Sequence, residues 1–329
     1  MIKSPLITVI MPVYNTELYV ADAISSILQQ SLTDIELICI DDGSTDRSRE
    51  ICETFEASDE RVSVIYQTNS GQGTARNRAL EKARGQFIYF MDSDDILAPR
   101  ALEQVSYEMA SKQLDLLFFE AHCFGDVEKV NDYKRQESYE GVYSGPDLAK
   151  LLLNNDEFIV SPCLYVASTD LFRMNDIRFL EGVKHEDDIA TILVLLHAKR
   201  ASCVHWDLYA RRYRPGSTMT SFNPEASTKG AFRTYCDLLR RQRAAANGSP
   251  LRSAAAYAFL ERCRHETVRL FSHCTVPPEQ FAKLVGCRDD DELQVASEIV
   301  STVFDMGVRF YVERILRHLK RRLRNGLRN

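Results

Sequence analysis

The sequence has little of several features that would place the protein in other classes. Its nine cysteines are scattered and odd in number, and none forms a Cys-x-x-Cys pair. We therefore expect neither a disulfide framework nor a zinc site, and a reduced cytoplasmic compartment. No apolar run approaches the length of a membrane span, and the first residues lack the apolar region of a signal peptide. The net charge of −6 gives no indication of a nucleic-acid-binding protein.

The length and the pattern of apolar residues predict an α/β fold. The chain has 329 residues, 45% of them hydrophobic, which is enough for a large core, and the length favours two domains. Short apolar runs alternate with longer segments of helical periodicity, which favours a Rossmann-like, mostly parallel sheet with flanking helices. Cys163–Val166 and Ala201–Trp206 predict strands of a smaller, mixed region. We expect this domain to cover residues 1–220 and a helical region to cover residues 221–329.

One apolar run leads directly into three acids. Phe87–Met91 is too short and too uniformly apolar for a half-exposed strand, so it predicts a central strand covered on both faces. Asp92, Asp94 and Asp95 follow it, at the edge where open α/β sheets bind ligands. Asp92 and Asp94 could reach one Mg²⁺ or Mn²⁺ ion that also holds substrate phosphates. The alternative is a polar turn whose acids cap the next helix.

Two further strands also end on polar residues. The first strand starts near Leu6 and is expected to break at Pro12, just before Tyr14 and Asn15. The second covers residues 35–40 and ends on Asp41 and Asp42, and we expect Ser44 to cap the helix that follows. Because parallel strands end at one edge of a sheet, the three polar clusters predict a single cleft. A third helix is expected over residues 70–84, with Gly85 as its C-cap.

Five motifs carry a resemblance to a known family. In chain order they cover residues 9–15, 40–46, 71–77, 91–95 and 185–188, with the text VIMPVYN, IDDGSTD, GQGTARN, MDSDD and HEDD. With these motifs the chain resembles a family 2 glycosyltransferase of the GT-A fold, of the kind that builds bacterial surface polysaccharides. The resemblance covers roughly residues 5–215, and the C-terminal third carries no matching motif.

The resemblance implies a nucleoside-diphosphate-sugar donor, commonly a uridine one, a Mn²⁺ or Mg²⁺ ion, and an inverting transfer. The residues that would line the donor nucleotide site are Pro12, Tyr14, Asn15, Asp42, Arg76, Asp92 and Arg214. Asp42 would accept a hydrogen bond from the base, and Arg76 would face the diphosphate. Asp94, alone or with Asp92, would bind the metal, which together with Arg76 would stabilise the charge on the leaving diphosphate.

The resemblance also places a catalytic base in the run Glu186-Asp187-Asp188. We assign the base to Asp187, with Glu186 and Asp188 as near alternatives, because a carboxylate can take the proton of an attacking acceptor hydroxyl. Acids at a helix start also stabilise the helix dipole without any catalytic role. The acceptor would be a glycan or a lipid-linked saccharide. Many relatives carry an Asn-Lys pair where this chain has Pro162-Cys163, which leaves the acceptor-side geometry open.

Two other functions are compatible with such a fold. A nucleotidyltransferase would be expected to show a glycine-rich, basic loop after the first strand, and residues 11–15 contain neither glycine nor a cation. A non-catalytic sugar- or membrane-binding scaffold would not need all the acids that are present.

The C-terminal segment has an unusual charge. From Arg309 to the end there are eight Lys or Arg residues and one Glu, so this segment carries +7 and the rest of the chain −13. Apolar residues recur at three- and four-residue steps from Phe304 to Leu323. A basic amphipathic helix of this kind suits an anionic membrane surface, here the inner face of the plasma membrane. Packing against the acidic body or a homodimer contact are the alternatives.

Overall fold

The computed structural model describes residues 4–125, 132–139, 141–214, 223–277 and 280–303. These residues divide into two compact units, one drawn from Met1–Phe222 with Arg240–Phe259 and the other from Asn223–Leu239 with Leu260–Asn329. Among the described helices, none has the length and apolar character needed to cross a membrane. The predicted basic helix from Arg309 onward lies outside the described residues.

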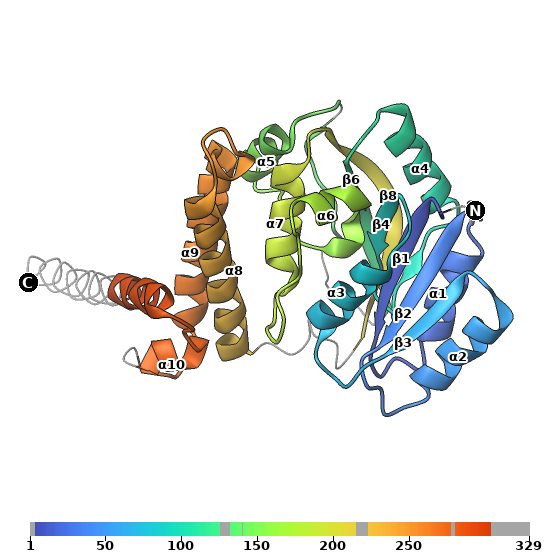
Figure 1. The fold of residues 1–329 in the computed structure, drawn as a ribbon, viewed down its shortest axis with the longest axis horizontal. Coiled ribbons are helices and arrows are strands. Elements are labelled where there is room, and N and C mark those ends of the chain that lie inside the picture. Colours follow the sequence, from blue (N-terminus) through green and yellow to red (C-terminus); the bar gives the residue numbers. More distant parts are fainter. Residues whose placement is uncertain (1–3, 126–131, 140, 215–222, 278–279, 304–329) are drawn as a thin grey trace, which may run out of the picture. The chain divides into compact units, whose positions relative to one another are not determined.

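One eight-stranded sheet organises the first unit, in the order β3-β2-β1-β4-β7-β6-β8-β5 (Figure 1). The strands are β1 (Ile7–Val13), β2 (Ile35–Asp41), β3 (Val62–Tyr66), β4 (Phe87–Phe90), β5 (Ile96–Leu97), β6 (Leu116–Gly125), β7 (Tyr165–Ser168) and β8 (Ala201–Tyr213). The neighbours from β3 to β4 are parallel, as are β6 and β8, whereas β7 and β5 run antiparallel to their neighbours. The predicted mostly parallel α/β sheet is confirmed. The smaller mixed region was wrong, because β7 pairs with both β4 and β6 and so joins both halves into one sheet.

Helices of ordinary length connect and follow these strands. They are α1 (Val20–Leu28), α2 (Ser48–Ser58), α3 (Gln72–Lys82), α4 (Ala101–Ser111), α5 (Gly145–Asn154), α6 (Thr169–Met174), α7 (Asp187–His197), α8 (Pro224–Ala244), α9 (Ala254–Phe271) and α10 (Phe281–Val285). In the second unit the ring of Phe281 lies 4.4 Å from that of Phe271 and 5.6 Å from that of Phe232, which forms an aromatic core.

The central strands are buried on both faces. Every residue of β1, β2 and β4 is buried, as the apolar run before Asp92 predicts. The expected break at Pro12 was wrong, since β1 continues to Val13 and Pro12 pairs in register with Ile40. Met91 donates to the carbonyl of Ile10, so alternate residues of β1, including Pro12, face the β4 side. The register with β4 ends at Ile10, so the missing N–H of Pro12 costs no ladder hydrogen bond.

Two predicted helix boundaries were also wrong. α2 begins at Ser48, not after Ser44, because the Asp46 carboxylate accepts the hydrogen bond from the Ser48 amide at 2.9 Å. α3 ends at Lys82, and Gly85 does not cap it. Gly85 instead lies against β1, where its amide donates to the Thr8 hydroxyl at 2.8 Å. A Cβ there would lie 2.4 Å from the Thr8 amide nitrogen, so only glycine allows this approach.

Candidate active site

The loops after β1, β2 and β4 are joined by hydrogen bonds. The amide of Asp42 donates to the carbonyl of Val13 at 2.8 Å, which aligns the ends of β2 and β1. The hydroxyl of Thr16, after β1, donates to that of Ser93, after β4, at 3.0 Å, and both side chains are buried. The three polar clusters that the sequence predicts at strand ends therefore lie beside one another.

The residues after β1 have distinct surroundings. Pro12 is buried within the strand, and Tyr14 is 46% exposed. Asn15 adopts a left-handed conformation with φ of 51°, and its side-chain oxygen accepts from the amide of Thr45 at 2.8 Å. Its own amide donates to the Ser44 hydroxyl at 3.2 Å. Asn15 therefore connects two loops of the site, and Tyr14 presents an accessible aromatic ring.

Asp42 is a buried carboxylate that holds the start of α3. It accepts hydrogen bonds from the side-chain amide of Gln67 at 2.8 Å, from the amide of Ser70 at 2.7 Å and from that of Gly71 at 2.8 Å. A carboxylate has about four acceptor positions, so one remains for another donor. Asp42 thus fixes the loop that leads into α3 while it keeps limited capacity to bind a further N–H group.

Arg76 on α3 is buried between two carboxylates. Its guanidinium lies 3.0 Å from Asp92 Oδ1 and 2.8 Å from Glu186 Oε1, and it donates a weaker hydrogen bond to the side-chain oxygen of Gln72 at 3.3 Å. Burial opposes its charge, but Asp92 and then Glu186 raise the pKa of Arg76 above its ordinary value. Arg76 therefore stays charged and ties the end of β4 to the start of α7, 110 residues away in the chain.

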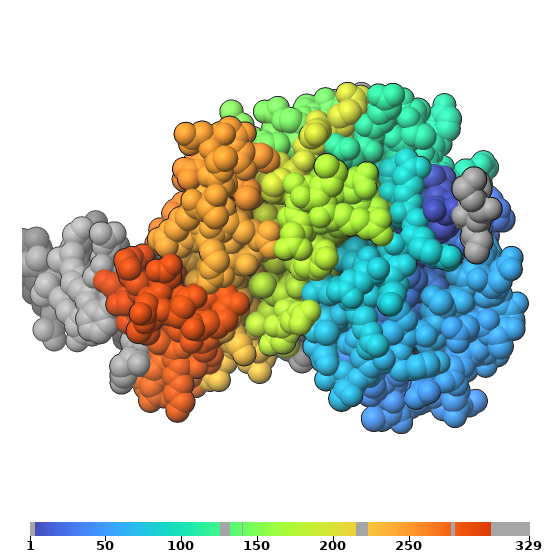
Figure 2. Space-filling view, viewed as in Figure 1, coloured from blue at the N-terminus to red at the C-terminus, as the bar shows by residue number. Residues whose placement is uncertain are grey.

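Two neighbours of Arg76 on α3 hold the segment that precedes Glu186. A Cβ at Gly73 would lie 2.1 Å from the carbonyl oxygen of Leu180, so the helix can approach this segment only at a glycine. The side-chain amide of Asn77 donates to the carbonyl of Phe179 at 3.0 Å and accepts from its amide at 2.9 Å. Figure 2 shows the α3 region, in cyan, against the yellow-green segment before α7. Gly73 and Asn77 belong to the motif at residues 71–77, but their positioning role was not predicted, because it depends on residues more than 100 positions later.

The acids after β4 have different partners. Asp94 is mostly buried and accepts from Nε of Arg214 at 2.7 Å, whereas the Asp92 side chain is 35% exposed. Burial and the charge of Asp92 raise the pKa of Asp94, and Arg214 partly opposes this. The buried Asp95 accepts from the Tyr209 hydroxyl at 2.6 Å, 114 residues later in the chain. No local pattern in the sequence indicates Tyr209, which also accepts from the amide of Asp92 at 3.3 Å.

Asp187 is the first residue of α7, directly after Glu186. Burial, and then the charge of Glu186, raise the pKa of Asp187 to about 7, although Arg76 opposes the shift. A carboxyl group whose pKa lies near neutral pH can accept a proton and release it again under ordinary conditions. Asp188 follows in the same helical turn, where the helix dipole favours acids.

Four of the residues expected at the site, Asp42, Arg76, Asp92 and Glu186, are linked by a chain of contacts. Contacts run from Asp42 through the start of α3 to Arg76, and from Arg76 to Asp92 and Glu186 on either side. In the part of the chain that the structure describes, no group of three or more His, Cys, Asp or Glu side chains could hold a metal ion. Mg²⁺ and Mn²⁺ need only one or two carboxylates when substrate phosphates complete the shell. The oxygen ligands of Asp92 and Asp94, which repel one another, fit such an ion.

Comparison with known proteins shows similarity to glycosyltransferases. Residues 8–172 match a family model described as glycosyl transferase family 2. An uncharacterized glycosyltransferase of Haemophilus influenzae is 36% identical over 70% of this chain and 88% of its own length. The uncharacterized glycosyltransferase EpsJ of Bacillus subtilis is 32% identical over 65% of this chain, and the match spans 62% of that relative.

A solved structure extends the likeness beyond the matched motifs. The crystal structure of S. aureus TarS 1-349 in complex with UDP-GlcNAc superposes with a TM-score of 0.67 and 25% sequence identity. The superposition covers 91% of this chain and 83% of that one. The eight-stranded α/β sheet described above therefore belongs to a fold shared with a protein that binds a nucleotide sugar.

Proposed function

The chain belongs to glycosyl transferase family 2, and from this premise we propose that it transfers a sugar from a nucleoside-diphosphate-sugar to an acceptor hydroxyl. The proposed donor is a UDP-sugar, and the acceptor is a glycan or lipid-linked saccharide of the cell-surface polysaccharide. The observation that carries the proposal is the connected set of Asp42, Arg76, Asp92 and Glu186, which brings the strand-end acids to the start of α7.

The donor nucleoside binds beside β1 and β2 in this proposal. The exposed ring of Tyr14 offers a flat apolar face to a base, and the remaining acceptor position of Asp42 suits an N–H of uracil. The UDP-GlcNAc bound to TarS 1-349 supports a uridine donor. Pro12 lies near the end of β1, and Asn15 holds the neighbouring loop through its side-chain oxygen, so both support the shape of this site.

The diphosphate lies next to Asp92, Asp94 and Arg214. When bound, a Mn²⁺ or Mg²⁺ ion there neutralises charge on the departing diphosphate. Arg214 already contacts Asp94 at 2.7 Å, so a small movement brings its guanidinium to a phosphate oxygen. Arg76 acts indirectly: its ion pairs with Asp92 and Glu186 keep both carboxylates oriented.

Asp187 serves as the base of an inverting displacement. The acceptor oxygen forms a bond to the anomeric carbon as the bond from that carbon to the diphosphate oxygen breaks. The electron pair leaves with the nucleoside diphosphate, and the hydroxyl proton passes to the Asp187 carboxylate. A pKa of about 7 suits this transfer near neutral pH.

Donor hydrolysis tests the proposal without knowledge of the acceptor. Purified protein is incubated with a panel of UDP-, GDP- and dTDP-sugars with Mn²⁺, and the released nucleoside diphosphate is measured. We expect turnover of one nucleotide class, loss of it in Asp94→Ala, and full activity in Asp170→Ala, which removes an exposed acid of α6. No turnover of any donor, or equal turnover by the Asp94 variant, contradicts the proposal.

We also propose that the basic segment from Arg309 onward brings the enzyme to the cytoplasmic face of the membrane. Its charge of +7 suits anionic lipids, and a lipid-linked acceptor would lie at the same surface. Sedimentation with anionic vesicles should capture the full chain and not a chain truncated before Arg309. Equal capture of both chains would refute this part of the proposal.

A further inference from the structure

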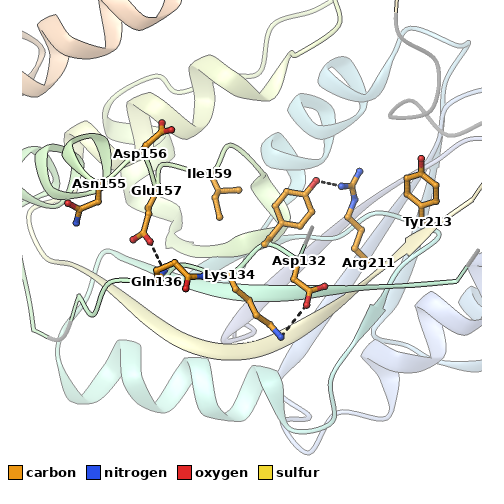
Figure 3. Close-up of a pocket in the computed structure, with 10 residues that line it drawn as sticks. Asp132, Lys134, Gln136, Asn155, Asp156, Glu157, Ile159, Arg211 and Tyr213 are labelled. Atoms are coloured by element: carbon orange, nitrogen blue, oxygen red, sulfur yellow. Dashed lines mark hydrogen bonds and ion pairs between the residues drawn. The ribbon is translucent and has the colours of Figure 1, made fainter. Parts of the chain in front are cut away.

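Two arginines at the end of β8 contact the segment that follows β4. Successive side chains of a strand point to opposite faces, so Arg212 and Arg214 share one face. Arg211 and Tyr213 belong to the other face, where they line a cavity (Figure 3). The Nε atom of Arg212 donates to the backbone carbonyl of Asp94 at 2.8 Å, and that of Arg214 donates to the Asp94 carboxylate at 2.7 Å. The two guanidinium groups therefore meet at one acid of the candidate site.

The ring of Tyr19 is a second group that these two arginines share. The Cζ atom of Arg212 lies 4.9 Å from the centre of this ring, and that of Arg214 lies 5.2 Å from it. Both distances fall within the roughly 6 Å over which the face of an aromatic ring attracts a cation. Tyr19 is partly buried, so water screens this attraction less than at a fully exposed site.

The backbone of Tyr19 is fixed relative to the acids after β4. Tyr19 is the N-cap residue of α1, and its carbonyl accepts from the amide of Ala23 at 3.1 Å. Its amide donates to the carbonyl of Thr16 at 2.8 Å. The hydroxyl of Thr16 donates to that of Ser93, one residue before Asp94. The ring of Tyr19 thus starts from a backbone that is tied to the site.

The two arginines differ in how many other contacts they have. Besides Tyr19 and the carbonyl of Asp94, the guanidinium of Arg212 lies 4.6 Å from the ring of Phe124, its register partner on β6. Among the described residues, the guanidinium of Arg214 contacts the Asp94 carboxylate and the Tyr19 ring. The position of Arg214 therefore depends on these two groups.

Asp94 is also the residue expected to bind a divalent cation. A carboxylate that is shared with a cation holds an arginine less strongly, because the two positive charges repel each other. The ring of Tyr19 attracts the guanidinium independently of Asp94. It is the contact that remains to Arg214 when Asp94 is engaged, and it keeps the guanidinium beside the place where the charge of a diphosphate arrives.

We propose that Tyr19 is a positioning residue, which holds Arg214 through the face of its ring so that the guanidinium can bind the diphosphate while Asp94 binds a cation. The inference rests on the proposed transfer reaction and deepens it, since it names the residue that sets the position of Arg214. Tyr19 acts through Arg214 and not on the nucleotide itself, which distinguishes its role from that of Tyr14.

The binding of UDP in the presence of Mn²⁺ tests this role, and calorimetric titration measures the Kd without any turnover. Tyr19→Leu removes the aromatic face and keeps an apolar side chain. We expect it to bind UDP roughly fivefold more weakly, the size of one cation–π contact at a partly buried site. Tyr19→Phe keeps the ring and should bind UDP as the wild type does. The matched control is Tyr107→Leu, the same change at an exposed position of α4, which should leave the Kd unchanged.

A double-mutant cycle separates the positioning of Arg214 from a general effect on the structure. Arg214→Gln should weaken UDP binding by more than Tyr19→Leu does. The double variant should bind UDP no more weakly than Arg214→Gln alone, because the ring then has no guanidinium at this position to hold.

Fluorinated phenylalanine at position 19 keeps the test open if Tyr19→Leu does not fold. Each added fluorine withdraws negative charge from the face of the ring and changes its shape little. UDP binding should therefore weaken stepwise as the number of fluorine atoms rises, since the attraction of a cation to the ring depends on that charge.

Several results overturn the role of Tyr19. These are wild-type UDP binding by Tyr19→Leu, an equal loss in Tyr19→Phe or in the control, losses that add in the double variant, and binding that fluorine does not change. Failure of the underlying transfer reaction has a different signature, because the wild type would then bind none of UDP, GDP and dTDP, and the role of Tyr19 would fall with it.

Discussion

Replacement of Asp187 by Asn gives the sharpest test of the base. The carboxyl group has a pKa of about 7 in the folded chain against an ordinary value of 3.8, because it is partly removed from solvent and lies beside the charge of Glu186. The folded state therefore binds more protons than the unfolded state between these two values, and stability falls as the pH rises through that window. At 1.36 kcal/mol per pKa unit, the charged carboxylate costs up to about 4 kcal/mol above neutral pH.

Asparagine does not titrate, so the variant avoids this cost. We expect Asp187→Asn to be more stable than the wild type at about pH 8, by up to about 4 kcal/mol, and equally stable below about pH 4. Urea denaturation across this range measures the difference. Asp170→Asn, an exposed acid in the first turn of α6, is the matched control and should follow the wild type at every pH.

The same variant should lose activity while it gains stability. Loss of a general base lowers the rate by roughly 10²–10⁴-fold. Wild-type kcat/KM should rise with pH through about 7 as Asp187 loses its proton, and the residual activity of the variant should lack this step. Equal activity of Asp187→Asn and wild type, or a variant less stable at about pH 8, would refute the reasoning and return Glu186 and Asp188 to consideration.

Three further variants test the groups that support the site. Arg76→Gln should lower the free energy of unfolding by roughly 3–5 kcal/mol in urea, because it leaves two carboxylates without their buried cation, and a change below about 1 kcal/mol would contradict this. Gly73→Ala should abolish transfer and lower the melting temperature, since the new Cβ would lie 2.1 Å from the carbonyl of Leu180; normal activity would show that the segment adapts freely. Tyr209→Phe removes the hydroxyl bonded to Asp95 and should cost about 1–3 kcal/mol by thermal unfolding, whereas an unchanged melting temperature would argue against that bond.

Local patterns in the sequence were sufficient to predict the buried strands at the centre of the sheet. The runs before Asp42 and Asp92 are apolar because both faces of β2 and β4 are covered, and burial of that kind is visible in any short window. The acids that follow stand where the strands stop, so their convergence follows from parallel pairing alone. The predicted end of β1 was wrong because a proline breaks a strand only where its missing N–H would have bonded to a neighbour. That depends on where β4 ends, which the local sequence does not specify.

The hydrogen-bond and ion-pair partners of the site residues could not be predicted from local sequence patterns. Asp42 looked like a free ligand, yet its hydrogen-bond donors come from positions 25 to 29 residues later. Arg76 was expected to face a diphosphate, and in the structure it pairs with Asp92 and with Glu186, 110 residues away. Such pairings depend on how β7 enters the sheet and carries the later segments back to α3, which apolar periodicity does not specify.

In the proposed mechanism the strand-end acids and a divalent cation together hold a nucleoside diphosphate. Calorimetric titration of UDP, GDP and dTDP into the wild type and Asp94→Asn, with and without Mn²⁺, tests it directly. We expect one nucleotide to bind the wild type, Mn²⁺ to tighten this binding, and Asp94→Asn to lose the gain from Mn²⁺. Binding that is indifferent to Mn²⁺ in both proteins, or no binding of any of the three nucleotides, would contradict it.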